Sequence, residues 1–390
     1  MTKEIFEFAN KIQNELIEMR REIHKNPELS FEEFETSQYI CKKLDEIGVP
    51  YKANVARTGI LATLQCGTQK KALLIRADID ALPLQEEAVS EYSSKNPGKM
   101  HACGHDAHTA ILLGTCMLLN SFKEKINGTV KFLFEPGEET TGGAKPMIEE
   151  GVLKNPDVDA CIALHVDPDI NVGGIAVKAG PIYASPDDFE ITIKGKGGHG
   201  AEPHLCIDPI LVSAQIINNL QTITSRFMNP FLPAVVSICS IHSGTASNVI
   251  PNTAKILGTA RALDLNVREL LKTSIETIVK GACEANNAEY EYIFTKLYPP
   301  LINDANIANM IFASAKKYLP NAVLGGSATM AGEDFAYFAQ SVPSALFKLG
   351  CKNDNKKVVN QLHNSNFDID EKCLKYGVMI FSDFALNFLK

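Results

Sequence analysis

The sequence predicts an α/β protein in which a mixed, largely parallel sheet is flanked by helices and a smaller α+β satellite domain is inserted. Three observations support this fold class. The chain has 390 residues, which is long for a single hydrophobic core. Its first half alternates short apolar runs with helical stretches, a pattern typical of a parallel sheet. Near Pro181 the pattern changes to strands in which apolar and polar residues alternate.

The first part of the chain contains the elements of the larger domain. Apolar residues at helical spacing within residues 1–26 predict a surface helix rather than a signal peptide. We expect buried strands in KALLIRADIDALP, KINGTVKFLFEP and DACIALHV, with helices in HTAILLGTCMLLNSF and GGAKPMIEEGVL. ALFKLG and EKCLKYGVMIFSDFALNFLK should complete this sheet and its helices. Residues at the carboxyl ends of such strands converge on one crevice.

The inserted part follows a different order of elements. We expect strands in ASPDDFEITIKGKGG, AVVSICSIHSG and TAKILGTARAL, and helices in IDPILVSAQIINNLQTI and NVRELLKTSIETIVKGACEANN. Connections of antiparallel length between them indicate an α+β sandwich. The larger domain is therefore expected at residues 1–181 and 296–390, and the satellite domain at residues 182–295.

Composition excludes several kinds of partner. The net charge of -8 and the lack of a basic block argue against nucleic acid and favour a small substrate. No uncharged apolar run approaches the roughly 20 residues that span a bilayer. The ten cysteines have no paired spacing and follow no export signal, which is typical of reduced thiols in the cytoplasm.

Metal-ligand residues gather in one short loop. Cys103 and His105 lie two residues apart in MHACGHDAH, so a thiolate and an imidazole can face one cation. A structural zinc site needs a second Cys or His pair at similar spacing, and the sequence has none. The loop therefore favours a metal site of another kind, with an unrelated polar loop as the alternative.

Other candidate ligands follow predicted strands. In FLFEPGEET, Glu138 and Glu139 are adjacent and cannot point the same way, so one can bind a metal while the other handles protons. His165 closes CIALHV and His363 lies in QLHNSNF. A lone His of this kind is more often structural. Together with Cys103, His105 and Glu139, however, these histidines would supply enough ligands for two metals with open positions.

These motifs occur, with RADIDALP, EPGEETTGGA, GKGGHGAEPH, ASNVIP and AGEDFAYF, in the order seen in the M20 metallopeptidase family. The chain resembles the amidohydrolase branch of that family over nearly its whole length. The resemblance implies hydrolysis of the amide bond of an N-acyl amino acid, with Glu138 as general base. It implies two divalent ions, either zinc, manganese, cobalt or nickel, with Glu139 as a ligand. N-acetyldiaminopimelate deacetylation and an aminoacyl or dipeptide carboxypeptidase activity stay open as alternatives.

The chain departs from the wider family at three places. Most members have His-x-Asp where this chain has Asp78-Ile79-Asp80, and a bridging Asp where this chain has Cys103. We expect His105 to replace the missing ligand, and either Asp78 or Asp80 to orient the ligands. Gly137 stands where Ala is common, and we expect it only to loosen the turn.

The resemblance also assigns residues of the satellite domain. His199 would stabilise the oxyanion, and Asn248 and Arg261 would grip the substrate carboxylate, a role that suits the planar fork of Arg. The resemblance further implies a homodimer formed through the satellite domain, with His199 acting on the neighbour's metals. Glycines around His199 permit the close approach of another chain.

Two rival interpretations fail on the sequence. Residues 195–200 read G-x-G-x-x-G, as in a dinucleotide-binding turn, but the acid expected about 20 residues further on is missing. A non-enzymatic relative should have lost the proton-handling Glu or several ligands, whereas every expected position is filled here.

Overall fold

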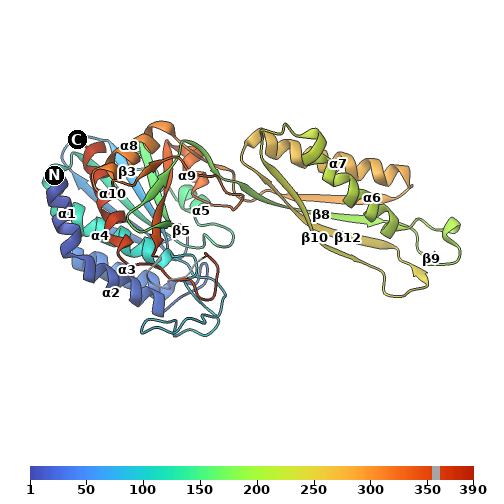
Figure 1. Ribbon diagram of the computed structural model, residues 1–390, viewed down its shortest axis with the longest axis horizontal. Helices are drawn as coiled ribbons and strands as arrows, with labels where there is room; N and C mark the ends of the chain where they lie inside the picture. Colours follow the sequence, from blue (N-terminus) through green and yellow to red (C-terminus); the bar gives the residue numbers. More distant parts are fainter. Residues whose placement is uncertain (354–360) are drawn as a thin grey trace. The chain divides into compact units, whose positions relative to one another are not determined.

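The computed structural model describes residues 1–353 and 361–390, which form two compact units (Figure 1). The larger unit consists of Met1–Gly180, Ile302–Ser327 and Tyr337–Lys390, and the smaller of Pro181–Leu301 and Ala328–Ala336.

The smaller unit differs from the expected satellite range because it includes a late segment of the chain. The carbonyl of Ala331 accepts a hydrogen bond from the Ala184 N–H at 2.9 Å, and the Thr329 N–H donates to the Ile182 carbonyl at 2.9 Å. Backbone pairing of this kind joins residues far apart in sequence, so sequence patterns could not assign this segment.

The larger unit is built on a mixed sheet whose central strands are parallel, which confirms the predicted fold class. β3 lies between β4 and β5 and runs parallel to both, and β5 is also parallel to β16. The eight strands lie in the order β1 (Tyr51–Val55), β2 (Gly59–Cys66), β4 (Gly128–Glu135), β3 (Ala72–Asp78), β5 (Ala160–Asn171), β16 (Ser344–Lys352), β6 (Ile175–Val177) and β15 (Val323–Leu324).

Helices flank this sheet, and α4 is deeply buried among them. α4 contacts α10 and α2, and almost every residue of its first four turns is buried. The single helix expected at the N-terminus is two helices, because the backbone at Ile12 departs from helical geometry. The helices are α1 (Thr2–Lys11), α2 (Gln13–Lys25), α3 (Phe34–Ile47), α4 (His105–Ser121), η1 (Lys123–Lys125), α5 (Ala144–Glu149), α8 (Ala305–Lys316), α9 (Ala336–Ser341) and α10 (Cys373–Phe388).

The smaller unit has a four-stranded antiparallel sheet with two long helices, α6 and α7, on one face (Figure 1). Asp208 and Asp264 cap these helices by accepting hydrogen bonds from their first N–H groups. The sheet order is β10 (Ala234–Ser243), β12 (Thr253–Ala262), β8 (Ser185–Lys194) and β13 (Glu289–Thr295); the helices are α6 (Pro209–Thr222), α7 (Leu265–Ala285), η2 (Pro203–Leu205) and η3 (Ile223–Phe227).

One strand of this sheet was not expected from the sequence. β13 pairs with β8 and forms one edge of the sheet. Its residues EYEYIFT alternate between exposed and half-buried, which is the pattern of a strand with one face covered. The remaining short strands are β7 (Gly180–Tyr183), β9 (Gly198–His199), β11 (Val249–Ile250) and β14 (Leu301–Asn303). Among the described residues, no helix combines the length and apolar character needed to cross a membrane.

Candidate active site

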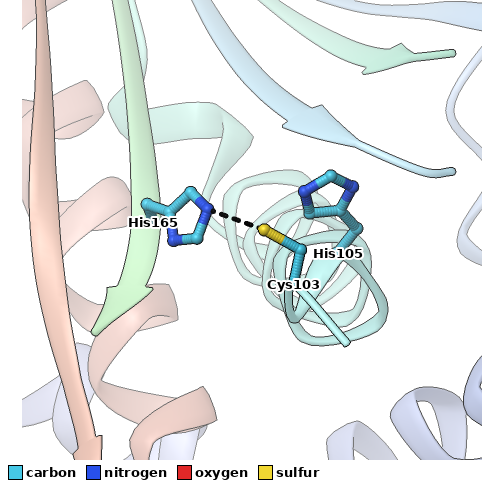
Figure 2. Close-up of side chains that lie close together, drawn as sticks. All are labelled: Cys103, His105 and His165. Atoms are coloured by element: carbon cyan, nitrogen blue, oxygen red, sulfur yellow. Dashed lines mark hydrogen bonds between the residues drawn. The ribbon is translucent and has the colours of Figure 1, made fainter. Parts of the chain in front are cut away.

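Cys103, in the loop before α4, and His105, the first residue of α4, lie against the middle of β5. Gly104 has φ of 85°, and a Cβ at this position would lie 2.4 Å from a methyl carbon of Val166. This glycine therefore allows the close approach of loop and strand. Figure 2 shows Cys103 and His105 beside His165, whose Nε2 lies 3.4 Å from the Cys103 Sγ. All three side chains are buried, and each offers a ligand atom within 4.8 Å of the others.

A second group of ligand atoms shares Cys103 with the first. Cys103, Glu139 and His363 also offer atoms within 4.8 Å of one another. The Glu139 Oε1 lies 3.3 Å from the His363 Nε2 and 3.8 Å from the His105 Nε2. Glu138 joins His105 and Glu139 in a further group of the same kind. The structure thus brings together all five sequence-predicted ligands and the predicted general base.

The hydrogen bonds of the histidines direct their free nitrogens into this cluster. His105 Nδ1 lies 3.0 Å from the Asp80 carbonyl and 3.1 Å from its Oδ1, so Nδ1 carries the proton. His165 Nδ1 likewise donates to the Val166 carbonyl at 2.7 Å. The buried His105 Nε2 has no hydrogen-bond partner. Such an orphaned nitrogen, oriented by a carboxylate behind it, fits a metal ligand.

His108 lies close to the cluster, but both of its ring nitrogens already make hydrogen bonds. Its Nδ1 donates to the Asp78 Oδ1 at 2.6 Å, and its Nε2 accepts the Val166 N–H at 3.0 Å. His108 is therefore a structural residue, although it stands near Asp78 and His105 in a group with metal-ligand spacing.

The same contacts show which of the two acids, Asp78 or Asp80, orients a metal ligand. Asp80 directly contacts Nδ1 of His105. Asp78 holds His108 and accepts a hydrogen bond from Arg76 at 2.7 Å, and its Oδ2 is 3.7 Å from the His105 Nε2. Asp80 is thus the acid that orients the imidazole, and Asp78 supplies buried negative charge beside it.

Burial and neighbouring carboxylates set the protonation of the cluster. Burial, followed by Glu139 and Glu138, raises the pKa of the Cys103 thiol well above its usual range. Burial alone would lower the pKa of His105, but Asp78 and Asp80 outweigh it and raise that pKa to about 10. Burial and then His108 hold the pKa of His165 well below its usual value. A divalent ion would compete with protons at these ligands, so its affinity should fall as the pH falls.

The smaller unit carries the other predicted site residues. His199 in β9 pairs with Val249 in β11, and its exposed ring accepts the Ala201 N–H at Nδ1 at 3.0 Å. Its Nε2 therefore carries the proton and can donate a hydrogen bond. Asn248 lies at the same turn, where its carbonyl accepts the Gly200 N–H at 2.9 Å. Arg261 lies apart from this turn in β12, half-buried, and its Nε donates to Thr259 at 3.1 Å.

Sequence reasoning missed a buried arginine that joins two ligand-bearing segments. Arg20 in α2 is fully buried and donates to Asp106 at 2.6 Å and to Asp368 at 2.8 Å. Asp106 directly follows His105, and Asp368 lies five residues after His363. The sequence pattern could have indicated this burial, because Arg20 follows Leu16 by four residues and so lies on the apolar side of the helix.

The expectation for Gly137 was wrong. Its φ is 72°, and a Cβ would lie 2.4 Å from the Phe31 ring. The glycine does not loosen the turn; it lets the backbone pack beneath an aromatic ring in a conformation that alanine rarely adopts.

Thiolate, imidazole and carboxylate groups gathered in one buried cluster are typical of a metal-dependent enzyme. The chain belongs to the peptidase family M20/M25/M40, whose model matches residues 74–387. It is 39% identical over 384 residues to thermostable carboxypeptidase 2 of Saccharolobus solfataricus, with 97% of each chain covered. It is 43% identical over 305 residues to the N-acyl-L-amino acid amidohydrolase of Geobacillus stearothermophilus, covering 78% of this chain and 82% of that protein.

A solved structure shares the architecture. The crystal structure of the YXEP protein of Bacillus subtilis, described as a dinuclear metal binding peptidase from the M20 family, superposes with a TM-score of 0.86. The two chains are 36% identical, and the match covers 97% of this chain and 99% of that one.

Proposed function

We propose that this chain hydrolyses the amide bond of N-acyl amino acids, releasing a carboxylate and the free amino acid. The observation that carries the proposal is the pair of ligand groups that share Cys103 and have Glu138 beside them. The amidohydrolase relative with 43% identity supports the same substrate class. We expect the reaction to occur in the cytoplasm, where thiols such as Cys103 stay reduced.

The buried cluster fits two divalent ions. One would be held by Cys103, His105 and His165, and the other by Cys103, Glu139 and His363, with the thiolate shared. Thiolate and imidazole ligands suit zinc, and manganese, cobalt and nickel are the other candidates. Bound ions would supply the Lewis acidity that activates water and polarises the amide carbonyl.

The chain's own residues would handle protons and substrate. Glu138 would accept the proton of the attacking water and return it to the leaving amine nitrogen. The Nε2–H of His199 would donate to the carbonyl oxygen as negative charge develops there. Asn248 and Arg261 would hold the carboxylate of the substrate.

A substrate panel tests this proposal. N-acetyl and N-benzoyl amino acids, N-acetyldiaminopimelate and dipeptides would be offered with each candidate metal, and release of the free amine measured. We expect the N-acyl amino acids to be cleaved with the highest kcat/KM. Preferential cleavage of dipeptides would favour the activity named for the carboxypeptidase relative. Preferential cleavage of N-acetyldiaminopimelate would point to the deacetylase.

Arg261→Ala should raise the KM for N-acyl amino acids but not for the corresponding amino-acid amides, which lack the carboxylate. A lost charged hydrogen bond costs roughly 1.5 to 3 kcal/mol, or about tenfold to a hundredfold in KM. Steady-state kinetics on matched acid and amide substrates measures the difference. Equal losses on both substrates would mean that Arg261 has only a structural role.

The family resemblance also leads us to propose a homodimer in which His199 serves the partner's metals. Mixing inactive Glu138→Gln chains with inactive His199→Ala chains should then restore part of the activity after subunit exchange. One site of the mixed dimer would carry both defects and the other neither. No recovery, with exchange verified by differently tagged chains, would assign His199 to its own subunit's site.

A further inference from the structure

The turn that carries Glu138 is held on both sides by buried carboxylates. The N–H of Gly137, just before Glu138, donates to the Glu33 Oε1 at 2.9 Å. The N–H of Glu139, just after it, donates to the Asp80 Oδ2 at 3.0 Å. Glu33 and Asp80 are 0% and 1% exposed. The backbone on either side of Glu138 is therefore fixed by groups that water does not reach.

Glu33 has both of its oxygens engaged. Its Oε1 also accepts the N–H of Phe31 at 2.8 Å, and its Oε2 accepts the Thr58 hydroxyl at 2.5 Å. These contacts set the direction of the carboxylate, so Oε1 presents one fixed acceptor to the turn.

The backbone around Glu33 is itself anchored. Glu33 occupies the position just before α3. The carboxylate of Glu28 accepts the N–H groups of Glu35 and Thr36 at 3.1 Å and 2.8 Å and so caps the start of that helix. Glu33 thus projects from a fixed helix start rather than from a free loop.

Packing closes the turn from another direction. The Phe31 ring covers Gly137 so closely that a Cβ on Gly137 would lie between 2.4 and 2.8 Å from three ring atoms. Phe31 itself has φ of 62°, which is unusual for an aromatic residue and keeps its N–H directed at Glu33. Ring and carboxylate together leave the turn little freedom to shift.

We propose that Glu33 is a positioning residue for catalysis, which fixes the Glu138 carboxylate through its hydrogen bond to the Gly137 N–H. The inference rests on the proposed function, because it takes Glu138 as the general base. Proton transfer requires the base within hydrogen-bond reach of the water in the correct direction. A displacement of about 1 Å can cost on the order of a hundredfold in rate. Glu33 does not touch the reacting atoms; it acts through the peptide before the base.

Three substitutions of Glu33 distinguish the effect of side-chain length from the effect of charge. Gln keeps the length and an oxygen that accepts both N–H groups, Asp keeps the charge but is one methylene shorter, and Ala keeps neither. We expect Glu33→Asp and Glu33→Ala to lower kcat about tenfold to a hundredfold, with KM and metal content unchanged. Glu33→Gln should stay within about threefold of the native kcat, since the decisive hydrogen bond survives. Glu32→Ala, which removes the exposed neighbouring carboxylate, is the matched control.

A second readout does not depend on turnover. Hydrogen–deuterium exchange at the Gly137 amide should be faster in Glu33→Asp and Glu33→Ala than in the native chain, and close to native in Glu33→Gln. If Glu33→Ala does not fold, the Asp and Gln variants alone decide. Native kcat in Glu33→Asp with loss in Glu33→Gln would overturn the proposal, as would native exchange in all three. If the native chain cleaves no N-acyl amino acid, the proposed function fails, and exchange still decides whether Glu33 fixes the turn.

Discussion

Glu138→Gln is expected to abolish turnover while two metals and the fold are retained. Gln has nearly the same shape but cannot accept the proton of the attacking water. Loss of a general base costs on the order of a hundredfold to ten-thousandfold in rate. The hydrogen bonds that hold the turn come from the Gly137 and Glu139 amides and do not use the Glu138 carboxylate.

Kinetics and elemental analysis on the same preparation check this result. Glu139→Gln is an informative comparison, because Glu139 belongs to the ligand group of Cys103 and His363. It should lower metal content as well as activity. Near-native turnover by Glu138→Gln would show that another group accepts the proton.

Cys103→Ala is expected to release both metals, because its sulfur is the one atom common to the two ligand groups. His363→Ala should release only the ion that it shares with Glu139. Deleting a ligand that coordinates directly weakens binding strongly, so we expect metal content per chain to fall from about two to below about one half in the first variant and to about one in the second.

Elemental analysis after dialysis measures both values. Cys116→Ala, which removes a buried thiol in α4 outside these groups, controls for the loss of a cysteine. Equal stoichiometry in the Cys103→Ala and His363→Ala variants would mean that the sulfur does not join the two sites.

The sequence was informative wherever function and fold were encoded in short local patterns. The strands that became β3, β4 and β5 were recognisable as apolar runs, and Glu138 and Glu139 follow the end of β4 as expected. His165 was expected to close its strand, but β5 continues to Asn171, so His165 lies within it. The carboxyl ends of parallel strands meet at one edge, so His165 and the Glu138–Glu139 pair could be expected to lie close together. Cys103 and His105 were recognisable by a different pattern, their metal-ligand spacing in one short segment.

Features that depend on contacts between distant segments could not be predicted from the sequence. Glu33 and Gly137 are 104 residues apart, and no periodicity links them. The choice between Asp78 and Asp80 depended on where β3 ends, since Asp78 is its last residue and Asp80 lies beyond it. Element boundaries are the least predictable feature of a sequence. β13 was missed for a related reason: its alternation is clear, but it directly follows a long helix.

We propose above all that this chain is an amidohydrolase that depends on two metal ions. The most direct test is to titrate the metal-free chain with zinc or manganese and to record the rate of amine release from an N-acyl amino acid. The rate should rise from baseline and level off at about two ions per chain, as expected for a dinuclear site. Full activity in the metal-free chain, or saturation at a single ion, would contradict the account.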